Sequence, residues 1–213
     1  MNFIFLGDSI TDAGRNTGSG CPEAIGQGYV MLLAAKLGEA FPMRDRFVNV
    51  GVSGERIVDT YAQIKCRCWS NQPDAVSVYL GINDVLHDYL HGNGVEAKRF
   101  YNVYRMLLSD TRERFPDVKF ILLAPFLLPG PFMDGSTEEK LADVRKTVDA
   151  IDRLGAEFSC PVLHLQEVFD AACKRAESCF WSADGIHPTP AGHQLIADAW
   201  LNTFDSFYGS LKV

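Results

Sequence analysis

The sequence predicts a three-layer α/β/α fold built on a five-stranded parallel sheet. Short apolar runs of four to six residues recur along the chain, longer amphipathic stretches separate them, and polar turn segments follow most of the runs directly. Strands that alternate with helices in this way form parallel sheets, whose crossover helices cover both faces. The expected strands are 3–6, 47–50, 75–80, 120–124 and 162–165.

Residues 2–6 form the first apolar run and lead straight into Gly7. No basic segment precedes them and no small-residue cleavage site follows, so we expect a first strand and not a signal peptide. Apolar runs elsewhere stay below 18 residues, which predicts no transmembrane segment and no membrane partner. The expected location is therefore the cytoplasm, where cysteines remain reduced.

The stretches between and after the strands show helical spacing. In the third of them, apolar side chains recur every three or four residues while charged side chains take the other faces, as in a helix that covers a sheet. The last begins where Thr189 fits the N-cap and Pro190 the first helical position. By contrast, residues 85–94, with His87 and His91, read as a polar loop. The expected helices span about 28–40, 56–67, 96–115, 138–157 and 190–208.

Length and composition predict a single domain covering residues 1–213, since no linker, repeat or low-complexity tract interrupts the pattern. The 27 acidic against 20 basic residues give a net charge of −7, which argues against a nucleic-acid partner. Cys66 and Cys68 form an isolated CxC pair, without a second pair at zinc-site spacing. We expect no metal and no cofactor, and oligomerisation stays open.

Ligands of parallel α/β sheets bind beyond the carboxyl ends of the strands. A serine hydrolase needs a hydroxyl nucleophile, an imidazole base, a carboxylate that orients the imidazole and donors for the oxyanion. Segments that follow the predicted strands supply Ser9, Gly54 and Asn83, and the loop before the last predicted helix supplies Asp184 and His187, so all four roles are filled. Gly54 lets a backbone N–H approach an oxyanion unobstructed, and Asn83 supplies an uncharged amide donor.

The spacing of the acid and the histidine favours one carboxylate over two others. Asp184 lies three residues before His187, around a glycine, so its carboxylate can reach the ring nitrogen that faces away from Ser9. Asp8 and Asp84 compete for the same role. Each of these two suits a structural task instead, because aspartates in turns accept hydrogen bonds from nearby backbone N–H groups.

Several aromatic and histidine side chains have more than one interpretation. Trp181 is large enough to stack on a sugar, and so is Trp69, with core packing as the alternative for both. Trp181 and Asp8 are the candidate substrate-binding residues. His164 ends a strand and is expected to be a hydrogen-bonded core residue, whereas His193 is expected to pack or bond near the active-site loop.

Four segments carry a family resemblance. They are Gly7-Asp-Ser-Ile10, Asn49-Val-Gly-Val-Ser-Gly54, Gly81-Ile-Asn-Asp84 and Asp184-Gly-Ile-His-Pro188. Together they resemble the four blocks of the SGNH, or GDSL, hydrolases, in order and over essentially the whole chain. The resemblance implies a flavodoxin-like SGNH hydrolase fold, with Ser9 as nucleophile, Asp184 as orienting acid and His187 as general base and then acid. It also implies an oxyanion hole made of the backbone N–H groups of Ser9 and Gly54 with the side chain of Asn83.

A narrower likeness concerns the substrate. The extended first block through Arg15, the segments Gly26-Gln-Gly-Tyr-Val30 and His187-Pro-Thr-Pro-Ala-Gly-His193, and the two middle blocks resemble the acetylxylan esterases and related carbohydrate O-deacetylases. This likeness implies a small-molecule acyl ester as partner, with an acetyl group removed from an O-acetylated sugar or xylo-oligosaccharide.

Two other functions fit parts of the pattern. The same triad could hydrolyse a lysophospholipid or a thioester. A flavodoxin-like binding domain or receiver-like signalling domain would also contain five alternating strands. A phosphate-accepting receiver, however, needs a lysine after the fifth strand, where this chain has Gln166 and Glu167.

Overall fold

The computed structural model describes residues 1–16, 22–131 and 137–211. It contains a five-stranded sheet in the order β2-β1-β3-β4-β5, in which every neighbouring pair is parallel. The strands are β1 Asn2–Gly7, β2 Arg46–Asn49, β3 Ala75–Tyr79, β4 Lys119–Ala124 and β5 Val162–His164. The predicted fold class is therefore confirmed, and all five predicted strands are present.

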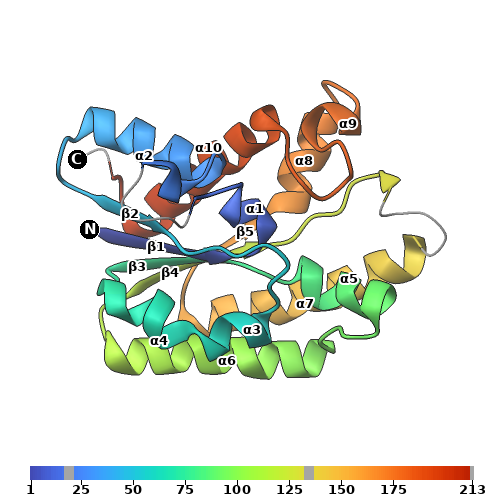
Figure 1. Ribbon diagram of the computed structural model, residues 1–213, viewed down its shortest axis with the longest axis horizontal. Coiled ribbons are helices and arrows are strands. Elements are labelled where there is room, and N and C mark those ends of the chain that lie inside the picture. Colours follow the sequence, from blue (N-terminus) through green and yellow to red (C-terminus); the bar gives the residue numbers. More distant parts are fainter. Residues whose placement is uncertain (17–21, 132–136, 212–213) are drawn as a thin grey trace.

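Helices cover both faces of this sheet, as Figure 1 shows. On one side lie α2, α8 and α10, and on the other lie α3, α4, α6 and α7. The described helices are α1 Ser9–Asp12, η1 Pro22–Ile25, α2 Tyr29–Ala40, α3 Ile57–Ala62, α4 Ile64–Arg67, η2 Trp69–Asn71, α5 Ile82–His91, α6 Ala97–Arg114, α7 Thr137–Phe158, α8 Leu165–Cys173, α9 Ser178–Trp181 and α10 Pro190–Tyr208. Among these helices, none combines the length and apolar character needed to cross a membrane.

The alternation of side chains along each strand divides the core into two parts. In β1, Phe3 and Phe5 enter the cluster beneath α2, α8 and α10, while Ile4 and Leu6 enter the cluster beneath the opposite helices. All four side chains are at most 1% exposed. A strand that is buried on both faces has a continuous apolar run in its sequence, which is why the strands could be predicted from the sequence.

The last helix begins as its sequence predicts. The Thr189 hydroxyl oxygen accepts a hydrogen bond from the N–H of Gly192 at 3.3 Å, and Pro190 occupies the first turn. This cap fixes the point at which the chain leaves the active-site loop and enters α10. Since an N-cap contact of this kind stabilises a helix by about 1 kcal/mol, it also anchors that loop.

Several helices differ from the sequence-based expectation. The short helices α1 and α9 were not expected, and the helix expected at 56–67 is present as two helices, α3 and α4. Residues 82–91 form α5, although 85–94 had read as a polar loop, so His87 and His91 are helical. The polar histidines obscure the fact that Ile82, Val85 and Leu86 are buried at helical spacing. Helix α8 was not expected, and it starts directly after β5 without an intervening turn.

Candidate active site

The first strand ends at a sharp turn that presents Ser9. A side chain at Gly7 would lie 2.1 Å from the Thr11 hydroxyl, so only glycine lets the chain turn this tightly into α1. Asp8 caps the helix by accepting the N–H of Ile10 at 3.0 Å. The turn places the Ser9 Oγ 2.8 Å from the Nε2 of His187, which lies 178 residues further along the chain.

The loop between α9 and α10 brings His187 to that position. An antiparallel bridge between Ser182 and Pro188 closes the loop at its base. At its tip, the Asp184 Oδ2 lies 2.6 Å from the Nδ1 of His187. The other carboxylate oxygen accepts the backbone N–H groups of Ile186 at 2.9 Å and of His187 at 2.7 Å. The carboxylate therefore holds the loop and the imidazole in one orientation.

The environment of Asp184 favours its charged form. Partial burial raises the pKa of this carboxyl, but the hydrogen bonds from the imidazole and from the two backbone N–H groups outweigh burial and leave the pKa below its ordinary value. The side chains of Asp184 and His187 are 31% and 47% exposed. Asp184 is thus ionised at neutral pH, and both side chains are open to solvent.

Two backbone N–H groups, that of Ser9 itself and that of Gly54, are the candidate donors to an oxyanion. Within the described chain, neither the N–H of Ser9 nor that of Gly54 donates to a protein acceptor. Gly54 has a φ of +82°, in the left-handed region that favours glycine. Asn83, at the start of α5, donates one amide hydrogen to the carbonyl of Glu55 at 3.1 Å, next to Gly54. Its second amide hydrogen remains available.

This arrangement can perform acyl transfer. A hydroxyl within hydrogen-bond distance of an imidazole can lose its proton to the ring, and a carboxylate on the far ring nitrogen stabilises the resulting imidazolium. Free N–H donors on neighbouring segments can stabilise an oxyanion. Among residues 1–16, 22–131 and 137–211, no group of three or more His, Cys, Asp or Glu side chains is placed to hold a metal ion.

Asp8 lies beneath the serine and not at the surface. Its side chain is fully buried, and its Oδ2 has no hydrogen-bond partner in the described structure. Burial raises the pKa of Asp8 to about 7, although the N–H of Ile10 and the nearby His187 act in the opposite direction. The structure therefore does not place Asp8 where a substrate could touch it, and the expectation that it binds substrate is not supported.

The buried carboxyl makes stability depend on pH. Unfolded, Asp8 titrates near 3.8, whereas in the folded protein its pKa is about 7. Between these values the folded state holds a proton that the unfolded state lacks, so the contribution of Asp8 to stability falls as the pH rises from about 4 to 7. We expect Asp8→Asn, whose amide oxygen can still accept from Ile10, to be roughly 2–4 kcal/mol more stable than the wild type at pH 8 and no more stable at pH 4. Urea denaturation from pH 4 to 8 measures this.

Asp45 provides the matched control, because its pKa shifts in the opposite direction. Burial raises the pKa of Asp45, but hydrogen bonds from Arg44 and the amino terminus prevail and lower it. Asp45→Asn should therefore lose stability at pH 8 and lose less as the pH falls through the acidic range. A difference between Asp8→Asn and the wild type that does not change with pH would contradict the prediction.

His193 and His164 lie outside the triad in different surroundings. His193 stacks on Tyr29, and its Nδ1 accepts the N–H of Tyr29 at 3.2 Å, which confirms the expected packing near the loop. Burial, with a smaller effect of His187, lowers the pKa of His193 to about 4, so this ring is neutral. His164 was expected in the core but is partly exposed, with its Nε2 3.2 Å from the Oδ1 of Asp152. His164 lies at the end of a short strand at the edge of the sheet, which places its side chain at the surface.

The aromatic residues of this region lie differently from the expectation. The ring of Trp181 is only 7% exposed, and its Nε1 donates to the carbonyl of Ala176 at 3.3 Å. It packs in the core and offers no exposed platform for a sugar. The neighbouring Phe180 is 56% exposed and makes an edge-to-face contact with Trp181. Trp69 is also a packing residue, and its Nε1 donates to the Thr111 hydroxyl.

Asn49 supports the site and was not singled out from the sequence. Its side-chain amide donates to the carbonyls of Thr11 at 2.6 Å and Ile25 at 2.8 Å, and its Oδ1 accepts the N–H of Gly51. It thereby joins the β2 loop to α1. The available signal was a polar residue within the otherwise apolar run 47–50.

Comparisons with known proteins agree with this geometry. The profile of the GDSL-like Lipase/Acylhydrolase family matches residues 5–195. An acetylxylan esterase of Geobacillus stearothermophilus is 31% identical over 210 residues, covering 93% of this chain and 91% of the relative.

Solved structures extend the agreement to the fold. A putative GDSL-like lipase from Parabacteroides merdae is 32% identical with a TM-score of 0.87, and the match covers 95% of this chain and 94% of that one. A catalytic mutant of the Geobacillus stearothermophilus acetylxylan esterase is 28% identical with a TM-score of 0.85, covering 100% and 95% of the two chains. The chain therefore belongs to the GDSL-like lipase/acylhydrolase family, and it is a carboxylic ester hydrolase with the SGNH hydrolase fold.

Proposed function

We propose that this esterase removes acetyl groups from O-acetylated sugars or xylo-oligosaccharides through an acyl-enzyme intermediate on Ser9. The observation that carries the proposal is the continuous chain of contacts from the Ser9 Oγ to the His187 Nε2, at 2.8 Å, and from the His187 Nδ1 to the Asp184 carboxylate, at 2.6 Å. Contacts of this length and order are those of a nucleophile, its base and the group that orients the base.

In the first half of the reaction, the Ser9 Oγ attacks the ester carbonyl while its proton passes to the Nε2 of His187. The imidazolium that forms is stabilised by the ionised Asp184, whose pKa is already below the ordinary range. The imidazolium then gives its proton to the departing sugar oxygen. The tetrahedral intermediate formed by the attack then collapses: the carbonyl re-forms, the bond to the sugar oxygen breaks, and the acyl-enzyme remains while a sugar with a free hydroxyl is released.

In the second half, water attacks the acyl group and His187 accepts the proton of that water. The acid is released, and the proton returns from the imidazolium to the Ser9 Oγ. Each tetrahedral intermediate carries a negative oxygen. We assign its stabilisation to the backbone N–H groups of Ser9 and Gly54, neither of which has a protein acceptor, and to the second amide hydrogen of Asn83.

Two observations support a sugar acetate over other esters. The side chains of His187 and Asp184 are 47% and 31% exposed, which leaves room for a bulky polar alcohol at the triad. A relative that is 31% identical along almost the whole chain is an acetylxylan esterase. The net charge of −7 is also compatible with a neutral sugar ester.

A substrate panel tests the proposal. Release of the free acid is measured from acetylated xylo-oligosaccharides, acetylated monosaccharides and a series of simple esters with acyl chains from acetyl to decanoyl. The expected order places acetyl and butyryl esters above decanoyl esters, and acetylated xylo-oligosaccharides above simple acetates. Preference for decanoyl esters, lysophospholipids or thioesters would assign this triad to the alternative acyl substrates.

The amide of Asn83 gives a more specific prediction. Asn83→Ala should lower kcat on an acetate ester by roughly 10²- to 10³-fold, because it removes one oxyanion donor while leaving the triad in place. Asn71→Ala is the matched control, since the Asn71 amide also donates to a backbone carbonyl, that of Arg67, and lies on η2 away from the site. A loss of less than a few-fold in Asn83→Ala would mean that another group holds this donor position.

A further inference from the structure

The two backbone donors assigned to the oxyanion belong to different segments of the chain. Ser9 begins α1, whereas Gly54 lies in the loop after β2. Gly54 is itself exposed, and a side chain built on it would meet no atom within 4 Å. The position of the Gly54 N–H is therefore set by the backbone on either side of it. The N–H of Glu55 donates to the carbonyl of Val52 at 3.2 Å and closes a turn around Ser53 and Gly54, and the contacts of Ser53 fix where this turn lies relative to Ser9.

Asp12, the last residue of α1, makes the required contact. Its Oδ2 accepts two hydrogen bonds from Ser53, one from the backbone N–H at 3.1 Å and one from the hydroxyl at 2.9 Å. Its Oδ1 accepts the backbone N–H of Arg15 at 3.2 Å. Ser53 directly precedes Gly54, and Asp12 lies on the same helical turn as Ser9. One carboxylate thus joins the two donor segments.

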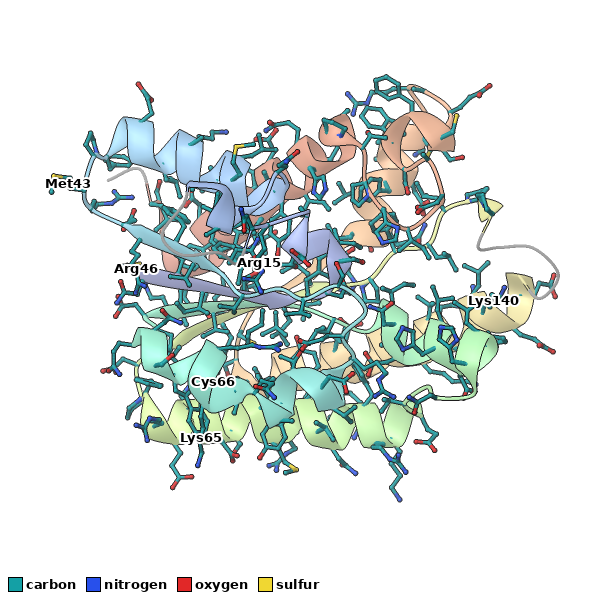
Figure 2. All side chains as sticks on the ribbon, in the orientation of Figure 1. Arg15, Met43, Arg46, Lys65, Cys66 and Lys140 are labelled. Carbon is teal, nitrogen blue, oxygen red and sulfur yellow. The ribbon has the colours of Figure 1, made fainter. Side chains whose placement is uncertain are left out.

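Arg15 reinforces the same junction. Its Nε donates to the carbonyl of Gly51 at 2.6 Å and lies 3.7 Å from the Oδ1 of Asp12. Figure 2 shows Arg15 close to α1 and to the edge of the sheet at β2. A side chain at Gly51 would lie 2.6 Å from the backbone nitrogen of Asp12, so the loop rests directly on α1.

The hydrogen bonds between Asp12 and Ser53 are the last contacts along the loop before Gly54. Earlier in the loop, the N–H of Val52 donates to the carbonyl of Gly7 at 2.9 Å. That bond fixes the loop beside β1 but lies two residues before Gly54. Since Ser53 is held by the bonds of both its N–H and its hydroxyl to Asp12, the orientation of the next peptide unit, which carries the Gly54 N–H, depends on Asp12.

We propose that Asp12, acting through Ser53, is a positioning residue that fixes the Gly54 N–H relative to Ser9 and thereby sets the geometry of the oxyanion hole. The inference rests on the proposed function, because it requires that Ser9 is the nucleophile. Asp12 touches no reacting atom. Its effect on the reaction is to keep two donors at the separation that a tetrahedral oxygen requires.

The expected signature is a loss of kcat without a matching change in KM. Misplacing a group by about 1 Å can cost on the order of 10² in rate. Asp12→Ala should therefore lower kcat about 10- to 100-fold and leave KM within about twofold, because oxyanion donors act in the transition state. Asp12→Asn keeps one oxygen for Ser53 and should recover most of kcat. Ser53→Ala keeps the N–H contact and should lose only about two- to fivefold.

Asp45 again provides the control, because it also joins two segments of the chain. It accepts hydrogen bonds from the amino terminus at 2.8 Å and from Arg44 at 2.9 Å, at the opposite end of the strands. Asp45→Ala should lower the melting temperature and leave kcat unchanged. The double variant Asp12→Ala/Ser53→Ala should lose no more activity than Asp12→Ala alone, since the hydroxyl of Ser53 acts through Asp12.

Steady-state kinetics on an acetate ester and thermal denaturation of all variants decide the matter. A kcat of Asp12→Ala within twofold of the wild type would overturn the inference, as would multiplicative losses in the double variant. If Asp12→Ala does not fold, Ser53→Ala carries the test, and a wild-type kcat for Ser53→Ala would overturn the inference. An active Ser9→Ala variant would refute the proposed function itself, whereas an inactive Ser9→Ala beside an active Asp12→Ala refutes only the role of Asp12.

Discussion

Ser9→Ala is expected to lower kcat for an acetate ester by about 10⁴-fold or more. The substitution removes the only atom that could form the acyl-enzyme at this position, and His187 then has no hydroxyl from which to accept a proton. Oxyanion donors and substrate binding persist, so a small residual rate above that in water is expected. KM, or the affinity for the product sugar, should change little because the backbone of α1 is unaffected.

Two measurements make this result specific. Ser70→Ala removes a hydroxyl that donates to the carbonyl of Cys66 on the side of the molecule away from the triad, and it should retain wild-type kcat. A serine-directed fluorophosphonate should label the wild type stoichiometrically and leave Ser9→Ala unlabelled. Turnover by Ser9→Ala at a tenth of the wild-type rate or more would rule out the acyl-enzyme mechanism on this residue.

The strands could be predicted from the sequence because the sheet is buried on both faces. Val76, Val78 and Leu80 face one core cluster while Ala75 and Tyr79 face the other, so the run is apolar apart from the buried Ser77, whose hydroxyl oxygen accepts the Nε1–H of Trp200 at 3.0 Å. Helix α5 could not be predicted in the same way. Its ten residues include two histidines and two aspartates, and only tertiary packing shows that one narrow face is buried.

Some features of the candidate site could likewise be predicted from the sequence, and others could not. Asp184 and His187 are three residues apart, so the contact between them is local and visible in the sequence. Burial of Trp181 and Asp8 depends on which side of a short turn faces the core, which spacing does not specify. The contact between Asp12 and Ser53 spans 41 residues and could come only from the fold.

Family membership decides between enzyme and binding domain, which the fold alone does not. The sheet order β2-β1-β3-β4-β5 is also that of flavodoxin-like and receiver domains. Chemistry therefore has to be argued from the site. In this site a serine hydroxyl contacts an imidazole, and a carboxylate holds that imidazole. A receiver domain does not need these three groups together, whereas each of them has a role in ester hydrolysis.

Asp184→Asn should lower kcat by about 10³- to 10⁴-fold while the loop keeps its structure. The two carboxylate oxygens have different tasks, since Oδ1 accepts the N–H groups of Ile186 and His187 and Oδ2 faces the His187 Nδ1. An asparagine has one oxygen, which the two backbone donors will occupy. Its NH₂ group then points at Nδ1, so this nitrogen must become the acceptor and the ring proton moves to Nε2. A protonated Nε2 cannot accept the proton of Ser9.

The control for this argument is another histidine–carboxylate pair on the same protein. Asp152→Asn changes the contact to His164, 3.2 Å long and outside the site, and should leave kcat as in the wild type. Asp184→Asn should also retain its melting temperature to within a few degrees, because the amide oxygen still caps the loop. If kcat instead stays above a tenth of the wild-type value, another carboxylate orients the imidazole. The buried Asp8, which His187 already affects electrostatically, is then the group to substitute next.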